Sequence, residues 1–330
     1  MIKKTLILLV VAVLALTFTE FDTEQFITEI ISDYKGGEKP SEPCSIPLYE
    51  GERTAYIGMS ESEVYSLFGE PCDILKSEYG FLWNVFHKEY KNYIQIGTQN
   101  GKVVGIYTNS PEFSFKSIQV GTPISDVYLT FETPLTYIKK GNTKYIANGI
   151  AEEKSGMAVF WEDNLYITVF YDMFKNNSVT SINIIDYNTE QGFDRIFASP
   201  TQELYESFER LNFYAVNSLR VREGLSPFKW NEKLSEIADI HSEEMAENDY
   251  FDHTDLSGGS VPDRADSAGI KYGKIGENIA MGAQNSVFMH EMLMNSEGHR
   301  RNLLDDFTYM GVGVSFSYED VPYLTQNFLR

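Results

Sequence analysis

The pattern of apolar and polar positions divides the chain into four segments. An uncharged apolar run occupies most of residues 1–19, and a polar, acidic stretch broken by Gly and Pro follows over residues 20–51. Residues 52–190 contain short apolar runs of strand length separated by turn-forming residues, whereas residues 200–330 contain longer stripes of helical spacing. The pattern therefore predicts an α+β protein in which a leader and a stalk precede two folded domains.

A short helix motif occurs twice in the segment 52–190. Its shared positions lie 63 residues apart, as Gly58, Val64 and Phe68 in the first copy and Gly121, Val127 and Phe131 in the second. Strand-like runs follow each copy, at 81–86, 93–96 and 103–107 and then at 158–161, 165–171 and 179–185. The segment is therefore expected to be a tandem repeat. Two helix-plus-hairpin units, each too small to bury its own sheet, would pack as one α+β domain.

The segment 200–330 combines helices with a few strands. Apolar positions of helical spacing predict one helix from about Ser199 to Gly224 and a second after Trp230. Shorter helices are expected near 262–268 and 286–295, and strands at 277–281, 312–318 and 323–329. Helices grouped around a small antiparallel sheet form a layered α+β domain.

The composition limits the partners and the sources of stability. The chain has 27 basic and 48 acidic side chains, a formal net charge of −21. A field of this sign repels phosphate backbones, so nucleic acid is not expected as a partner. The two cysteines, Cys44 and Cys72, leave at most one disulfide, so packed cores must supply most of the stability.

The first residues predict export. Lys3 and Lys4 precede the apolar run and Glu20 follows it, a charge order that places the body of the chain outside the cytoplasm. The run is shorter than the roughly 20 residues that span a bilayer, yet it lacks a clear small-x-small cleavage site. A cleaved signal peptide and an uncleaved signal anchor both remain open. The chain is expected to be membrane-anchored facing outside, or secreted, with membrane contact through this segment only.

Two histidines and one glutamate stand at the ends of predicted elements. His253 follows the second predicted helix, Glu277 begins a predicted strand and His299 follows the last predicted helix. Side chains at element ends can converge on a cleft. Their separation along the chain is too long for the spacing alone to identify a metal site.

A series of short motifs runs in order along residues 203–328. They are Asn217 and Arg220, Trp230, His241-Ser242, Phe251 with His253, Asp263-Arg264, Gly276-Glu277-Asn278-Ile279-Ala280, Asn295-Ser296 with Gly298-His299-Arg300, Gly311-Val312-Gly313, and Gln326-Asn327-Phe328. Each motif is weak by itself. The ordered set resembles the CAP superfamily, the cysteine-rich secretory and pathogenesis-related proteins.

This resemblance implies a three-layer α-β-α sandwich with a cleft lined by two histidines and two acidic residues. By motif position, His253, Glu277 and His299 match three of the four. The fourth acidic position has no firm counterpart, because Glu291 and Glu297 both lie near it and Ser296 can occupy its place. The expected cleft-lining residues are His253, Glu277, His299, Ser296 and Glu291.

The chemistry that such a cluster could support is limited. Two neutral imidazoles and a carboxylate can hold Zn²⁺ with an open position for water, so a divalent metal on His253, Glu277 and His299 is one hypothesis. Without a metal, a His–Glu pair could act as a general base and its orienting acid. Ser296 beside His299 is a conceivable nucleophile, but the chain has no Gly-x-Ser-x-Gly turn. No catalytic residue is assigned.

The repeat motif of residues 52–190 is similar to the CAP-associated amino-terminal domain of bacterial envelope proteins. Together the two resemblances favour an extracytoplasmic envelope protein whose CAP domain binds a lipid, a peptide or another envelope protein. The alternative is a metal-assisted hydrolase acting on peptide or cell-wall material. A fold shared by proteins of several functions does not decide between binding and catalysis.

Overall fold

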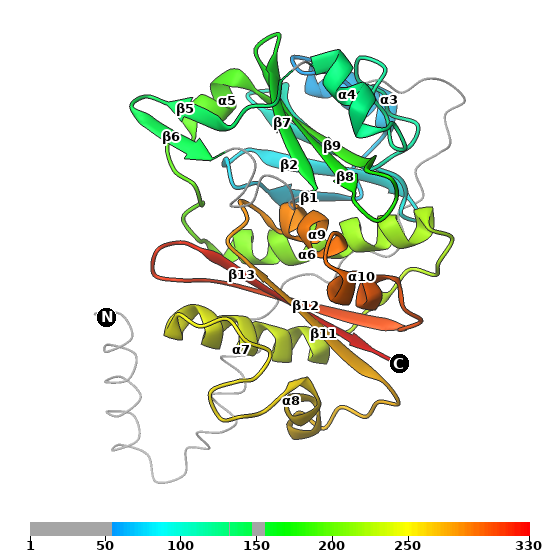
Figure 1. Ribbon diagram of the computed structural model, residues 1–330, viewed down its shortest axis with the longest axis vertical. Helices are drawn as coiled ribbons and strands as arrows, with labels where there is room; N and C mark the ends of the chain where they lie inside the picture. Colours follow the sequence, from blue (N-terminus) through cyan, green and yellow to red (C-terminus); the bar gives the residue numbers. More distant parts are fainter. Residues whose placement is uncertain (1–54, 132, 147–155) are drawn as a thin grey trace. The chain divides into compact units, whose positions relative to one another are not determined.

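The computed structural model describes residues 55–131, 133–146 and 156–330. The predicted leader, the predicted stalk and Cys44 lie outside these residues. Among the described helices, none is long and apolar enough to cross a membrane. The fold is α+β, as predicted, with two main sheets and helices packed on both (Figure 1).

The N-terminal part is built on a seven-stranded antiparallel sheet with the order β1-β2-β3-β4-β9-β8-β7. The strands are β1 (Asp73–Lys76), β2 (Leu82–Lys88), β3 (Lys91–Gln99), β4 (Lys102–Thr108), β7 (Met157–Glu162), β8 (Leu165–Asp172) and β9 (Ser178–Asp186). A separate hairpin joins β5 (Tyr137–Lys140) to β6 (Thr143–Ile146). The helices are α3 (Glu61–Phe68), α4 (Ile124–Phe131) and α5 (Tyr187–Gly192).

Helices α3 and α4 are attached to this sheet by the same hydrogen bonds. Gly58 N donates to Val103 O at 2.8 Å, and Gly121 N donates to Val179 O at 2.8 Å. These glycines have φ values of 91° and 92°, which side chains with a Cβ rarely adopt. Each helix turns a valine and a phenylalanine into one shared core: Val64, Phe68, Val127 and Phe131. Neither half therefore buries its helix without the other.

The C-terminal part is a four-stranded sheet between two helical layers. The sheet order is β10-β12-β13-β11, formed by β10 (Lys229–Trp230), β11 (Ile275–Met281), β12 (Tyr309–Phe316) and β13 (Pro322–Leu329). Helices α6 (Gln202–Arg222), α9 (Ser286–Met294) and α10 (Glu297–Leu304) cover one face, and α7 (Glu232–Asn248) and α8 (Val261–Ser267) cover the other (Figure 1). This is the three-layer α-β-α sandwich that the resemblance implied.

Two local predictions in this region were wrong. The first helix begins at Gln202 rather than near Ser199, because Thr201 is the residue whose side chain caps it, accepting from Leu204 N. The second is that one further helix was not predicted. Helix α9 ends at Met294 with Asn295 as its C-cap, and a separate helix, α10, contains His299.

Helix α7 packs directly on the backbone of β12. A Cβ atom at Gly313 would lie 2.1 Å from Asp239 N, and one at Gly311 would lie 2.3 Å from the carbonyl carbon of Leu234. The close approach also brings Ser242 Oγ within 3.0 Å of Gly313 O, to which it donates. Glycine at these two positions therefore sets how near the helix lies to the sheet.

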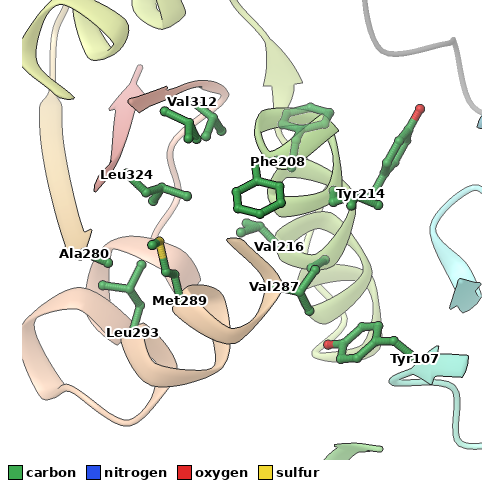
Figure 2. Close-up of a cluster of buried hydrophobic side chains, with 14 of the residues drawn as sticks. Tyr107, Phe208, Tyr214, Val216, Ala280, Val287, Met289, Leu293, Val312 and Leu324 are labelled. Carbon is green, nitrogen blue, oxygen red and sulfur yellow. The ribbon is translucent and has the colours of Figure 1, made fainter. Parts of the chain in front are cut away.

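Helices α6 and α9 are buried on two sides. One apolar core runs from the N-terminal sheet, represented by Tyr107 in Figure 2, across α6 and α9 to Val312 and Leu324 of the C-terminal sheet. Polar contacts cross the same boundary. Tyr107 Oη donates to Glu291 Oε1 at 2.6 Å, and Arg210 of α6 forms an ion pair with Asp73 of β1. The two sheets therefore share one layer of helices.

Glu78 is a buried carboxyl beside this shared layer. It lies in the turn between β1 and β2, where Asn285, the N-cap residue of α9, donates to its Oε1 at 2.5 Å. Burial raises the pKa of Glu78 to about 7, although the hydrogen bond from Asn285 acts in the opposite direction. The folded chain therefore binds the Glu78 proton more tightly than the unfolded chain does. Its free energy of unfolding is highest below the unfolded pKa, and this contribution is lost as the pH rises through the folded pKa.

The glycine packing generates a first prediction. Gly313→Ala should destabilise the chain by about 3 kcal/mol or more, because the new methyl group overlaps the backbone of α7. The measurement is the free energy of unfolding in urea. The matched control is Gly298→Ala, where a Cβ meets no atom within 4 Å, and its effect should stay within about 1 kcal/mol. Equal effects of the two variants would contradict this account of α7 packing.

A second prediction concerns Glu78→Gln, which keeps an acceptor for Asn285 but cannot ionise. The wild-type penalty for burying the carboxylate develops between about pH 4.5 and pH 7. The variant should therefore be more stable than wild type at pH 8, by up to about 3 kcal/mol, and close to it at pH 4.5. Urea unfolding at the two pH values measures this. A stability difference that does not grow with pH would rule out an ionisable Glu78 as its cause.

Candidate functional site

His253 and Glu277 come together at the edge strand of the C-terminal sheet. Asp249, with a φ of 53°, ends helix α7, and the loop after it carries His253. His241 Nε2 lies 3.0 Å from Asp252 O and fixes this loop. His253 Nδ1 lies 2.9 Å from Oε1 of Glu277, which projects from β11. The Glu277 side chain is only 2% exposed whereas that of His253 is 51% exposed, so the imidazole faces solvent with a buried carboxylate behind it.

Arg264 of α8 completes the support of Glu277. Its Nη2 lies 2.5 Å from Glu277 Oε2, and its Nη1 donates to Gly259 O at 3.1 Å. Both oxygens of the buried carboxylate are therefore engaged, one by an imidazole and one by a guanidinium. A carboxylate with these two partners is held in a fixed orientation. Asp263-Arg264 is one of the motifs that carry the family resemblance, but the sequence did not predict that Arg264 lies in the site.

His299 approaches from the opposite helical layer, on α10. Its ring centroid lies 6.4 Å from that of His253, with the ring planes inclined by 46°. Burial, and then the neighbouring His253, lower the pKa of His299, which favours a neutral ring at neutral pH. The rings of His253 and His299 are therefore neighbours, although they come from opposite helical layers.

Hydrogen bonds between polar residues of β11 and α10 fix the position of His299 relative to Glu277. Asn278 Nδ2 donates to His299 O at 3.2 Å, and Asn302 Nδ2 donates to Glu277 O at 3.1 Å. Asn302 Nδ2 also donates to Asn278 Oδ1 at 2.9 Å. The strand that carries Glu277 and the helix that carries His299 are thus joined by side-chain amides.

The other two expected cleft residues do not join this cluster. Glu291 is buried against the N-terminal sheet, where it accepts hydrogen bonds from Tyr107, Thr180 and Ser181. Ser296 occupies the N-cap position of α10 without a side-chain capping bond. Glu297, the alternative fourth acid, is exposed and lies 3.8 Å from Arg301. The placement of Glu291 follows from the shared helical layer, which a sequence pattern does not reveal.

His253, Glu277 and His299 do not fit a divalent metal as they lie. The oxygens of Glu277 already contact His253 and Arg264, and the Arg264 guanidinium opposes a second cation beside the same carboxylate. Among the residues that the structure describes, no group of three or more His, Cys, Asp and Glu side chains is placed to hold a metal ion.

Two concavities of the described chain lie elsewhere. A small, partly open cavity of about 10 Å³ is lined by Glu78, Tyr107 and Asn285, among others. A more open groove of about 230 Å³ lies between the β1–β2 turn and the start of α6, with Lys76, Tyr79 and Phe193 in its wall. Neither is lined by His253, Glu277 or His299.

Comparison with known protein families gives two matches. Residues 57–194 match the family described as CAP-associated N-terminal, and residues 213–328 match the cysteine-rich secretory protein family. The chain is 28% identical over 292 residues to the uncharacterized membrane protein YlbC of Bacillus subtilis (strain 168), covering 84% of this chain and 83% of that protein. It is 40% identical over 108 residues to the uncharacterized protein YkwD of the same strain, covering 32% of this chain and 42% of that protein.

Solved structures share the fold over most of both chains. An extracellular protein containing an SCP domain from Bacillus anthracis str. Ames aligns with a TM-score of 0.73 and 24% identity, covering 88% of this chain and 99% of that chain. A cysteine-rich secretory protein from Staphylococcus aureus subsp. aureus Mu50 aligns with a TM-score of 0.68 and 18% identity, covering 88% and 95%. The arrangement of the two parts is thus similar to that of known structures.

The support of Glu277 generates a third prediction. Arg264→Met should destabilise the chain by about 2–4 kcal/mol, because it leaves a buried carboxylate without its cation. Arg301→Met is the matched control. Arg301 is 70% exposed and its pair with Glu297 is solvated, so its loss should change stability by less than about 1 kcal/mol. Unfolding in urea at pH 7 measures both variants, and similar small losses would mean that Arg264 does not support a buried charge.

Proposed function

Because the chain carries a CAP domain of the cysteine-rich secretory protein family behind a CAP-associated N-terminal domain, we propose that it is a binding protein of the bacterial cell envelope. We place it outside the cytoplasm, membrane-anchored or secreted. The charge order around the first apolar run supports this location. So do the similarities to a membrane protein and to an extracellular protein.

The observation that carries the proposal is the pair of imidazoles in front of a buried carboxylate. Glu277 holds His253 Nδ1 at 2.9 Å and leaves the rest of that ring half-exposed, 6.4 Å from the ring of His299. A neutral imidazole can donate through one nitrogen and accept through the other. The two rings can therefore bracket a single hydroxyl or amide group, which both donates and accepts.

The ligand class follows from the polarity of these groups. Imidazoles, a carboxylate and a guanidinium recognise hydroxyl and amide groups rather than an acyl chain. Cell-wall glycan and peptide carry such groups at high density. We therefore propose that His253, Glu277 and His299 line a cleft that binds a peptidoglycan-like fragment.

Binding is favoured over turnover because no activated nucleophile accompanies the imidazoles in the described chain. Ser296, the candidate nearest to His299 in the sequence, makes no side-chain capping bond, and the site does not fit a metal as it lies. One observation favours a hydrolase as a second candidate. The carboxylate-oriented imidazole of His253 has the arrangement of a general base, which could activate a water held between the two rings.

The N-terminal domain is proposed as a second interaction module built from a tandem repeat. The matching hydrogen bonds of Gly58 and Gly121 to Val103 and Val179 support the repeat. So does the strand order, in which β2-β3-β4 and β9-β8-β7 meet at β4 and β9.

A fourth prediction tests the binding role. The full chain, labelled with ¹³C-histidine, is titrated with muropeptides released from Bacillus peptidoglycan by a muramidase. The ring signals of His253 and His299 should shift saturably, those of buried His87 and His290 should not, and the muropeptides should remain intact by mass spectrometry. His253→Ala should weaken binding by about tenfold or more, the loss of one to two hydrogen bonds from a partly buried site.

Three outcomes would count against this role. Muropeptides that leave both histidine signals unmoved would exclude this ligand class from the site. A shift produced only by short-chain phosphatidylglycerol would assign the site to a lipid headgroup. Release of a cleaved product that requires His253 would make the chain a hydrolase.

A further inference from the structure

The helix that carries His299 is held by the N-terminal domain. Arg300, the next residue along α10, forms an ion pair with Asp172 at the end of β8, with Arg300 Nη2 2.8 Å from Asp172 Oδ2. The two side chains are 13% and 4% exposed. The other arm of the guanidinium, Nη1, donates to Met294 O at 3.1 Å, at the end of α9. One arginine therefore ties the α9–α10 turn to the N-terminal sheet.

Asn295 makes a second tie at the same place. Its Oδ1 accepts from Met173 N at 2.9 Å, and its Nδ2 donates to Tyr171 O at 3.0 Å. The side-chain amide therefore makes two hydrogen bonds to the backbone at the end of β8. The space is closely filled, because a Cβ atom at Gly156 would lie 2.0 Å from Asn295 Nδ2. The turn that begins α10 thus has fixed partners in the N-terminal domain.

On its other side, α10 is tied to the strand that carries Glu277. Asn278 Nδ2 donates to His299 O, and Asn302 Nδ2 donates to Glu277 O. His299 consequently lies on a short helix held between two sheets, one in each domain. Its distance from His253 depends on both attachments.

We propose that Asp172 and Arg300 are positioning residues for His299, so that the N-terminal domain sets the geometry of the histidine site. The Arg300 side chain bonds to Asp172 and to Met294 O and not to the His299 ring, so the pair acts through the placement of α10. The inference deepens the proposed function, because it names the part of the chain that controls the same site. It also gives the N-terminal domain a role in the CAP domain's activity: anything that separates the β8–β9 turn from α10 would move one of the two imidazoles.

A general contribution to stability is the competing account, and the chain offers a matched control for it. Asp73 of β1 and Arg210 of α6 form another largely buried ion pair between the N-terminal sheet and the shared helical layer, with side chains 9% and 16% exposed. That pair is on α6, which carries none of the site residues. Loss of either ion pair should weaken the domain contact, but only the Asp172–Arg300 pair holds α10.

The experiment is ligand-free histidine NMR on the full chain, with hydrogen exchange of the α10 amides. Asp172→Asn and Arg300→Gln should each shift the ring signal of His299 and speed exchange in residues 297–304 by about tenfold, equivalent to about 1.4 kcal/mol of local stability. Asp73→Asn should leave the His299 signal in place. If Asp172→Asn folds poorly, Arg300→Lys keeps the charge and loses the two-armed contact, and a smaller shift in the same direction is expected.

Two results would overturn the proposal. One is a His299 signal and an α10 exchange rate that stay at wild-type values in the Asp172 and Arg300 variants. The other is a His299 shift of equal size in Asp73→Asn, since that would trace the effect to loosening of the whole contact. Because no ligand is present, failure of muropeptide binding does not affect this test, and its failure leaves the binding role standing.

Discussion

The whole arrangement depends on one constraint: helices α6 and α9 pack against two sheets at once, one on each side. A helix on the surface of a domain buries one face and leaves the other polar. Helix α6 instead buries every residue from Leu211 to Arg220, because the C-terminal sheet lies on one side and the N-terminal sheet on the other. Its polar residues are consequently bonded inside the protein, as when Asn212 Nδ2 donates to Ser286 O at 2.8 Å. The two domains are therefore halves of one packed structure.

This shared layer determines what reaches the histidine site. It buries Glu291 against Tyr107 and so removes that carboxylate from the cluster to which sequence position assigned it. It also presents the α9–α10 turn to Asp172 and leaves the opposite layer, α7 and α8, to supply His253 and Arg264. The site is made by the loop after α7, helix α8 and helix α10, which converge on the edge strand β11. The Glu277 carboxylate contacts His253 and Arg264, and Asn302 of α10 donates to the Glu277 backbone oxygen.

The sequence predicted the fold class, and it proposed His253, Glu277 and His299 as cleft residues, which the structure places near one another. Helical stripes and strand runs report burial on one face of an element, and they identified α6, α7 and the three main C-terminal strands. Such patterns do not show which part of the chain packs against a buried face. The partners of Glu291 and Asp172 could therefore not be predicted from the sequence. Arg264 was missed for a related reason. A charged residue does not contribute to the apolar pattern from which elements were predicted. Only the fold shows that Arg264 pairs with Glu277.

The most direct test of the shared core is equilibrium unfolding in urea followed at each tryptophan by ¹⁹F NMR. Trp83 and Trp161 report on the N-terminal sheet, and Trp230, on β10, reports on the C-terminal sheet. A single helical layer packed between both sheets predicts one transition with the same midpoint at all three positions. Separate midpoints, with Trp230 remaining folded after Trp83 and Trp161 have unfolded, would contradict it and show two domains that are merely in contact.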